Sequence, residues 1–391
     1  MFKDHREVGK NLDLFHIQEE AVGSIFWHEN GWFLYNKIKN YMRSIQRRYH
    51  YKEVNSPQML RKGLWEQSGH WDNYKQNMFC VSSVNENNNI DNLDYALKPM
   101  NCACHIQIYN RKIVSYKELP IRYSEFGQCM RNEPSGSLSG LMRVRSFVQD
   151  DAHIFCMEEQ IQSELQSFFK MAHEVYNHFG FKDIKIVLSG RPELSAGNDE
   201  QWEQAENVLK EACEIAGYDY DYDNSGGAFY APKLELKIKD HMDREWQCGT
   251  VQIDYILPQR LDAKYIDSHG KIKHPVILHR AILGSFERFI GILLENHGEN
   301  LPNWLHPRCL AIVDISENGF DESIIPLDYE QYVICKSKKD LRALIKKYSE
   351  EKYKFLLVYG RKEEESNSLP INVLGKDKIF VSIDELKKLL C

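Results

Sequence analysis

From residue 229 to residue 257, apolar and polar side chains alternate with a period of two. The apolar positions are Leu234, Leu236, Ile238, Val251, Ile253 and Tyr255. Successive side chains of a strand point to opposite faces, so this pattern predicts antiparallel sheet with one polar face. The polar face carries Gln247, Gln252 and Asp254. It is either the solvent side of the sheet or the floor of a pocket for a polar substrate.

Helical periodicity marks the stretches that accompany this sheet. Apolar residues recur at helical spacing over residues 31–51, which lead into a short strand at 52–57. Further helices are predicted over 158–180, 199–217 and 280–295, and an asparagine-rich loop over 85–92. The sequence therefore predicts an α+β fold with an antiparallel sheet.

The pattern changes after a linker-like stretch at residues 298–302. Strand-like segments at 308–315, 332–335, 353–358 and 379–383 alternate with helical segments at 338–351 and 384–390. This alternation is typical of a small α/β domain with a largely parallel sheet. We therefore expect two domains, residues 1–301 and residues 302–391.

Composition narrows the class of protein. The formal charge is −7, from 57 acidic and 50 basic residues, which excludes a polycation. The N-terminal segment is charged, and no apolar run approaches the roughly 18 residues that span a bilayer. The ten cysteines contain no CxxC pair. We expect a cytoplasmic protein with reduced cysteines and no membrane partner.

Charged and polar residues cluster at three places along the sequence. They are Arg131 and Glu133 with Arg143 and Arg145, the segment 148–153, and His279-Arg280 followed by Glu287-Arg288 on a predicted helix. None matches a glycine-rich phosphate loop, HExxH or a nucleophile elbow. Guanidinium groups can bind phosphate oxygens instead, although such residues are also common as surface ion pairs.

Metal-ligating side chains are present but widely spaced. The candidates are Cys102, Cys104, His105, His153 and His279. Their spacing matches no zinc-finger pattern, so each is equally consistent with a buried thiol or imidazole in the core.

The order of longer motifs is more specific. Seven strings follow one another along the chain: NLDLFHIQEEAVGSIFWHENGW, SGHWDNYKQNMF, KPMNCACHIQIY, FGQCMRNEPSGSLSGLMRVRSFVQDDAHIF, GGAFYAPKLELKIKD, WQCGTVQIDYILPQRL and HPVILHRAILGSFERFIGIL. Through these strings the chain, from residue 4 to residue 305, resembles the catalytic domain of threonyl-tRNA synthetase, a class II aminoacyl-tRNA synthetase. The resemblance implies a class II antiparallel sheet flanked by helices, followed by a small anticodon-binding-like α/β domain.

The resemblance also assigns roles to individual residues. Cys102, His153 and His279 match three ligands of a catalytic zinc, which leaves a position for the amino and hydroxyl groups of threonine. An apolar pocket alone discriminates weakly between threonine and valine. The side chains that match threonine-orienting residues are Gln149, Asp151 and Tyr230.

ATP recognition is assigned to a second set by the same resemblance. Arg131 would hold the α-phosphate, Glu133 would read the adenine amino group, and Arg143 and Arg288 would hold the β- and γ-phosphates with Mg²⁺. Arg131 and Arg288 are the expected catalytic residues. The residues that match positions around the adenylate are Gln247 and Gln252.

The function that the resemblance implies is threonine–tRNA ligation by a homodimer. Threonine would be activated with ATP to threonyl-adenylate and passed to the 3′ end of threonine tRNA. Two alternatives remain open: a paralogue that delivers threonine to a carrier-protein thiol, and a non-catalytic regulator that binds tRNA or threonine.

Several positions depart from the family pattern. Residues 101–105 read NCACH where relatives have NCPGH, and Cys104 is expected to point away from Cys102 along a strand. Met130 and Ser139 replace common histidines. Many relatives carry an N-terminal editing domain that hydrolyses mischarged seryl-tRNA, whereas this chain is expected to start at the catalytic domain. We therefore expect that serine is misactivated and that seryl-tRNA is not hydrolysed by this chain. The shortened C-terminal domain leaves the segment 338–352, with six basic and three acidic residues, as the stretch that could face phosphate.

Overall fold

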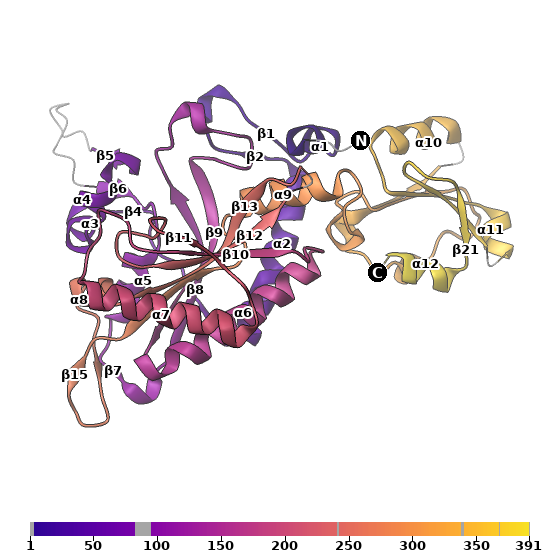
Figure 1. Ribbon diagram of the computed structural model, residues 1–391. Coiled ribbons are helices and arrows are strands. Elements are labelled where there is room, and N and C mark those ends of the chain that lie inside the picture. The colour runs from indigo at the N-terminus through magenta and orange to yellow at the C-terminus, as the bar shows by residue number, and fades with distance from the viewer. Residues whose placement is uncertain (1–3, 83–94, 241, 338–339, 367, 391) are drawn as a thin grey trace. The chain divides into compact units, whose positions relative to one another are not determined.

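The computed structural model describes the chain except for residues 1–3, 83–94, 241, 338–339, 367 and 391 (Figure 1). Two compact units are formed, Met1–Gln18 with Ile25–Tyr41 and Leu294–Cys391, and Glu19–Ser24 with Met42–Leu293. The domain boundary between residues 301 and 302 stays a prediction. The asparagine-rich loop expected over residues 85–92 lies outside the described residues.

The larger unit is built on an eight-stranded sheet with the order β11-β10-β12-β13-β16-β9-β8-β3. All neighbours from β10 through β8 pair antiparallel, whereas the edge strands β11 and β3 pair parallel. The strands are β3 (Lys52–Glu53), β8 (Ile121–Met130), β9 (Ser146–Cys156), β10 (Ile184–Ser189), β11 (Asp221–Asp223), β12 (Lys233–Lys239), β13 (Glu245–Asp254) and β16 (Val276–Ala281). The antiparallel sheet predicted from the period-two alternation is confirmed.

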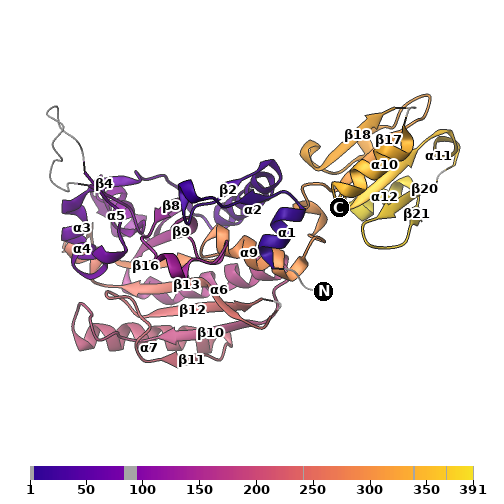
Figure 2. The same cartoon turned by 90° about the horizontal axis from the view of Figure 1, so that it is seen from above.

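One face of this sheet is covered by two helices (Figures 1 and 2). Helix α6 (Ile161–His178) packs on β13 and β16, and α7 (Asp199–Ala216) packs on β10 and β12. Apolar strand residues such as Val251 and Ile253 are buried. Helix α7 begins where Asn198 accepts the Gln201 N–H and ends at Gly217, whose φ of 73° favours glycine. Both predicted helices are confirmed.

The helix predicted over residues 280–295 is wrong at its start. Strand β16 extends to Ala281, and helix α9 (Phe286–His297) begins only after a turn at Gly284. The segment 276–283 is apolar except for His279 and Arg280, and a short apolar run does not distinguish a buried strand from a helix. Pairing with β9 and β13 on its two sides makes it a strand.

Smaller elements complete this unit at one end of the sheet. Helix α5 (Cys102–Tyr109) packs in a core with Trp65, Tyr123 and Phe155. The other elements are α3 (Lys62–Ser68), α4 (His70–Tyr74), α8 (Leu257–Arg260), β4 (Met59–Arg61), β5 (Cys80–Val81), β6 (Tyr95–Leu97), β7 (Val114–Ser115), β14 (Tyr265–Ile266) and β15 (Ile272–Lys273). Helix α2 (Glu29–Arg48) confirms the first predicted helix; it belongs to the smaller unit as far as Tyr41 and to the larger unit from Met42 onward, and Ile38 and Met42 are buried.

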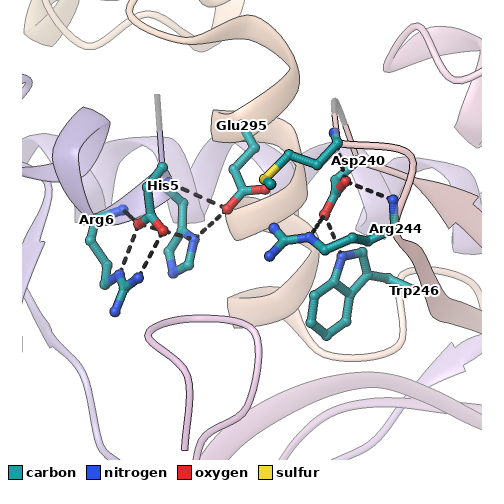
Figure 3. A network of polar contacts seen from close by, with 8 residues as sticks. His5, Arg6, Asp240, Arg244, Trp246 and Glu295 are labelled. Carbon is teal, nitrogen blue, oxygen red and sulfur yellow. Dashed lines mark hydrogen bonds and ion pairs between the residues drawn. The ribbon is translucent and has the colours of Figure 1, made fainter. Parts of the chain in front are cut away.

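The smaller unit contains α1 (His5–Asn11) and the paired strands β1 (Phe15–His16) and β2 (Phe26–Trp27). His5 Nδ1 lies 2.8 Å from Glu295 Oε1, and both side chains are buried (Figure 3). This contact ties α1 to the end of α9.

The C-terminal part of the smaller unit has a five-stranded sheet of order β18-β17-β19-β20-β21. The sheet is parallel on both sides of β17 but antiparallel at β19–β20 and β20–β21, so it is less parallel than predicted. Its elements are β17 (Leu310–Asp314), β18 (Tyr332–Lys336), β19 (Phe355–Tyr359), β20 (Leu369–Val373), β21 (Ile379–Val381), α10 (Leu341–Glu350), α11 (Arg361–Glu365) and α12 (Ile383–Leu390). Among the described residues, no helix combines the length and apolar character needed to span a bilayer.

Candidate active site

A cavity of about 440 Å³ lies in the larger unit, on the polar side of the eight-stranded sheet. All twelve side chains to which the sequence assigns a role line this cavity. They are Cys102, Arg131, Glu133, Arg143, Gln149, Asp151, His153, Tyr230, Gln247, Gln252, His279 and Arg288. The structure therefore brings together residues that are up to 186 positions apart in the sequence, from Cys102 to Arg288.

Strand register builds the cavity floor. Gln252 of β13 pairs with His279 of β16, which pairs with His153 of β9. Directly opposed residues of neighbouring strands point to the same face, so these three side chains form one row across the sheet. Of the two alternatives for the polar face, the structure shows the pocket floor rather than the solvent side. Asp254, two residues further along β13, is fully buried.

A cluster of three metal-ligating side chains lines the cavity. The donor atoms of Cys102, His153 and His279 all lie within 4.8 Å of one another, and each residue is at most 5% exposed. Cys102 is the first residue of α5, and the two histidines are directly opposed on neighbouring strands.

Cys104 lies on the same helix as Cys102, so its predicted place on a strand is wrong. The apolar run 102–109 forms a helix whose residues pack in the core. Positions two apart on a helix point in different directions, and Cys104 is outside the three-residue cluster. The structure therefore also places Cys104 outside the candidate metal site, but because of the helical geometry and not because of strand alternation.

The donor set fits Zn²⁺. Burial lowers the pKa of His153, which favours the neutral imidazole that a metal requires. Burial and the carboxylates of Asp151 and Asp254 raise the pKa of the Cys102 thiol well above its usual range. A divalent cation would offset that penalty, and one thiolate with two imidazoles is a known catalytic zinc set.

Each histidine of the cluster is oriented by a neighbour that the sequence did not assign to the site. His279 Nε2 lies 2.8 Å from Asp254 Oδ2, and the other oxygen of Asp254 accepts the N–H groups of Ile256 and Leu257. His153 Nδ1 lies 2.8 Å from Nδ1 of His105, a residue considered as a ligand itself. No local sequence pattern signals these contacts, because the partners are 25 and 48 positions apart.

Polar side chains surround the floor next to the cluster. Asn101 Nδ2 donates to Asp151 Oδ2 at 2.9 Å, and burial raises the pKa of Asp151. The Tyr230 hydroxyl donates to Gln252 Oε1 at 3.3 Å, and its ring centroid is 5.2 Å from that of His279. This part of the cavity offers a carboxylate, an amide and a hydroxyl to a small polar ligand.

Three of the arginines that line the cavity are those to which the sequence assigns a role. Arg131 Nε donates to Pro99 O at 3.2 Å, and Arg288 donates to the carbonyl oxygens of Met142 and Gln247, both at 3.0 Å. Arg143 Nη2 lies 2.8 Å from Glu133 Oε2. Burial lowers the pKa of Arg288, and the positive charges of Arg131 and Arg143 lower it further.

These arginines suit a polyanionic ligand. Arg131 and Arg288 donate to neutral carbonyl oxygens, which do not neutralise their charge. The mutual repulsion of the three guanidinium groups would be relieved by phosphate oxygens between them.

Trp246, the second residue of β13, lies near Arg288 and is hydrogen-bonded to the turn between β12 and β13. Asp240 accepts the Trp246 indole N–H at 2.8 Å and the Arg244 Nε–H at 2.6 Å (Figure 3). The Trp246 ring centroid lies 5.8 Å from the Arg288 guanidinium, within reach of a cation–π contact. Trp246 is a further residue that sequence reasoning missed.

Comparison with known proteins places these features in a family. The family model described as tRNA synthetase class II core domain (G, H, P, S and T) matches residues 82–297. A threonine–tRNA ligase of Prochlorococcus marinus is 46% identical over 99% of this chain and 61% of the relative. A second, from Cupriavidus necator, is 49% identical over 95% and 58%. The chain thus spans about three-fifths of the length of these curated relatives.

A solved structure also resembles this chain over nearly its whole length. A crystal structure titled as the RNA binding domain of threonyl-tRNA synthetase from Cryptosporidium parvum superposes with a TM-score of 0.88 at 36% identity. The match covers 99% of this chain and 98% of that one.

Proposed function

The chain belongs to the threonyl-tRNA synthetase family of class II tRNA synthetases, and on this premise we propose that it is an ATP-dependent threonine–tRNA ligase. It activates threonine and transfers it to the 3′ end of threonine tRNA, working as a homodimer. The observation that carries the proposal is one cavity lined both by a Cys-His-His cluster and by Arg131, Arg143 and Arg288. The cytoplasmic location expected from the sequence stays a prediction.

In the first step, the threonine carboxylate attacks the α-phosphorus of ATP and pyrophosphate leaves. Arg131 holds the α-phosphate and stabilises the charge that develops there. Arg143 and Arg288 hold the β- and γ-phosphates together with Mg²⁺, while Glu133 reads the adenine amino group. Because Glu133 and Arg143 are paired in the structure, ATP binding exchanges this ion pair for contacts of each partner with the nucleotide.

Threonine is recognised at the other end of the cavity. Cys102, His153 and His279 would hold zinc, which when bound would supply a Lewis acid for the amino and hydroxyl groups of threonine. Gln149, Asp151 and Tyr230 orient the bound amino acid, while Gln247 and Gln252 line the adenylate. In the second step, a ribose hydroxyl of the tRNA attacks the acyl carbonyl and AMP leaves. The comparisons do not favour a carrier-protein thiol as the acceptor.

The test is threonine-dependent exchange of pyrophosphate into ATP by the zinc-loaded chain, with valine as competitor. We expect exchange with threonine and little with valine, and Cys102→Ala should lose zinc and this selectivity together. Cys104→Ala on the same helix is the matched control and should retain both. Full zinc content in Cys102→Ala would refute the ligand assignment, and absence of exchange in the zinc-loaded chain would refute the activity.

A further inference from the structure

Behind His153, away from the cavity, lies a buried chain of polar groups that the proposed mechanism does not use. His105, Glu125 and Lys98 are each at most 2% exposed. They come from α5, from β8 and from the segment that precedes α5. His105 Nε2 lies 2.9 Å from Glu125 Oε2, and Lys98 Nζ lies 2.9 Å from Glu125 Oε1.

Glu125 is surrounded by donors. Its Oε1 accepts from the Ser56 N–H and from Lys98, and its Oε2 accepts from the Ser56 hydroxyl and from His105. Although burial opposes ionisation, hydrogen bonds from His105, Ser56 and Lys98 lower the pKa of Glu125 to about 2. An ionised carboxylate can only accept hydrogen bonds, so His105 must carry a proton on Nε2.

The proton on Nε2 determines what the other nitrogen of His105 does. Lys98 already balances the charge of Glu125, so the buried group has no net charge when His105 is a neutral imidazole. In a neutral imidazole with a proton on Nε2, Nδ1 is an acceptor. That Nδ1 faces Nδ1 of His153 at 2.8 Å, with the two rings nearly perpendicular at 84°. One proton must lie between the two nitrogens, and it therefore belongs to His153 Nδ1. The lone pair of His153 is then on Nε2.

His279 is held in the opposite tautomer. Asp254 accepts a hydrogen bond from His279 Nε2, which leaves the lone pair of that ring on Nδ1. We propose that Lys98, Glu125 and His105 are positioning residues that fix the tautomer of His153, so that zinc is bound by His153 Nε2 and His279 Nδ1. This inference rests on the zinc site of the proposed function and adds the residues that set it.

The direct test is nitrogen NMR of the zinc-loaded full chain labelled with [¹⁵N]histidine. The account expects a protonated Nδ1 and a metal-bound Nε2 for His153, with the reverse assignment for His279. Zinc bound through His153 Nδ1 would overturn the inference while leaving the zinc site intact. A wild-type chain that binds no zinc would overturn the zinc site and this inference with it.

A variant series tests the same point through zinc affinity, measured by competition with a chelator. His105→Leu removes the acceptor for His153 and should weaken zinc binding about 10- to 100-fold. His105→Gln offers an acceptor and a donor and should recover most of the affinity. Ser124→Ala, on the neighbouring residue of β8, is the control and should match the wild type, since Ser124 is buried with its hydroxyl unpaired. A folded His105→Leu variant with wild-type zinc affinity would refute the positioning role of His105.

Discussion

At the scale of single residues, the most direct prediction concerns Arg131. It follows β8 directly, its guanidinium lies 5.0 Å from the Phe147 ring centroid, and it lines the cavity. Arg131→Ala should lower threonine-dependent pyrophosphate exchange by about 100-fold or more, because preorganised charge at the reacting phosphate is lost. Arg131→Lys should recover little, since lysine lacks the bidentate fork.

The exposed Arg111, two residues after the end of α5, provides the control for charge removal. Arg111→Ala should leave the exchange rate unchanged. Exchange by Arg131→Ala within about tenfold of wild type, in a protein with a wild-type circular dichroism spectrum, would contradict the role of Arg131.

At the scale of elements, the close approach of α5 to β8 depends on Gly127. A Cβ at this position would lie 2.3 Å from Asn101 Oδ1 and 2.5 Å from its Nδ2. Asn101 precedes α5 and donates to Asp151. Gly127→Ala should therefore displace Asn101, disturb Asp151 and raise the KM for threonine about tenfold, with a smaller effect on the KM for ATP.

Gly136 is the matched control, because a Cβ there meets no atom within 4 Å. Gly136→Ala should keep both KM values. Equal changes in the KM for threonine and for ATP in Gly127→Ala would show that the substitution disturbs the cavity as a whole rather than the threonine end.

The contact between α9 and β9 predicts a pH dependence of stability. Burial raises the pKa of Glu287 to about 8, partly offset by the Val148 N–H that donates to it. The folded chain therefore holds this proton more tightly than the unfolded chain, whose glutamate has a pKa of about 4.3. The stabilising contribution is complete below about pH 4.3 and is lost as pH rises to about 8, at about 1.4 kcal/mol per pH unit for one proton.

Glu287→Gln removes this titration and keeps the neutral shape. Denaturant unfolding at a series of pH values should show the wild type losing stability relative to Glu287→Gln between about pH 5 and pH 8. Burial also raises the pKa of Asp150, to about 7. Asp150 is present in both proteins, so the difference between their free energies of unfolding reports on Glu287. A difference that stays constant with pH would contradict the buried, protonated state.

Much of the element order follows from periodicity, and particular failures show its limit. Alternation over residues 229–257 predicts β12 and β13, because one face of each strand is buried. The apolar runs at 276–283 and 102–109 carry no such period, and their structures are decided by tertiary partners. The twelve site residues came from matching motifs, whereas His105, Glu125 and Asp254 act through contacts between distant segments. Those contacts are fixed by sheet register and by the packing of α5, which no local pattern encodes.

At the scale of the whole molecule, the two chemical steps make different demands. Every residue that lines the cavity lies between positions 74 and 288, inside the larger unit. The amino-acid activation proposed above is therefore expected to depend on that unit. Transfer requires recognition of a tRNA as well, and the C-terminal sheet with α10, which carries Arg342, Lys346 and Lys347, is the expected contributor.

Charging of threonine tRNA with labelled threonine by the zinc-loaded chain tests both steps together and thus the central claim. The account predicts threonyl-tRNA that accumulates only with ATP and is lost in Arg131→Ala. Pyrophosphate exchange with threonine but no threonyl-tRNA, at any tRNA concentration that a functional relative charges, would contradict the proposed acceptor.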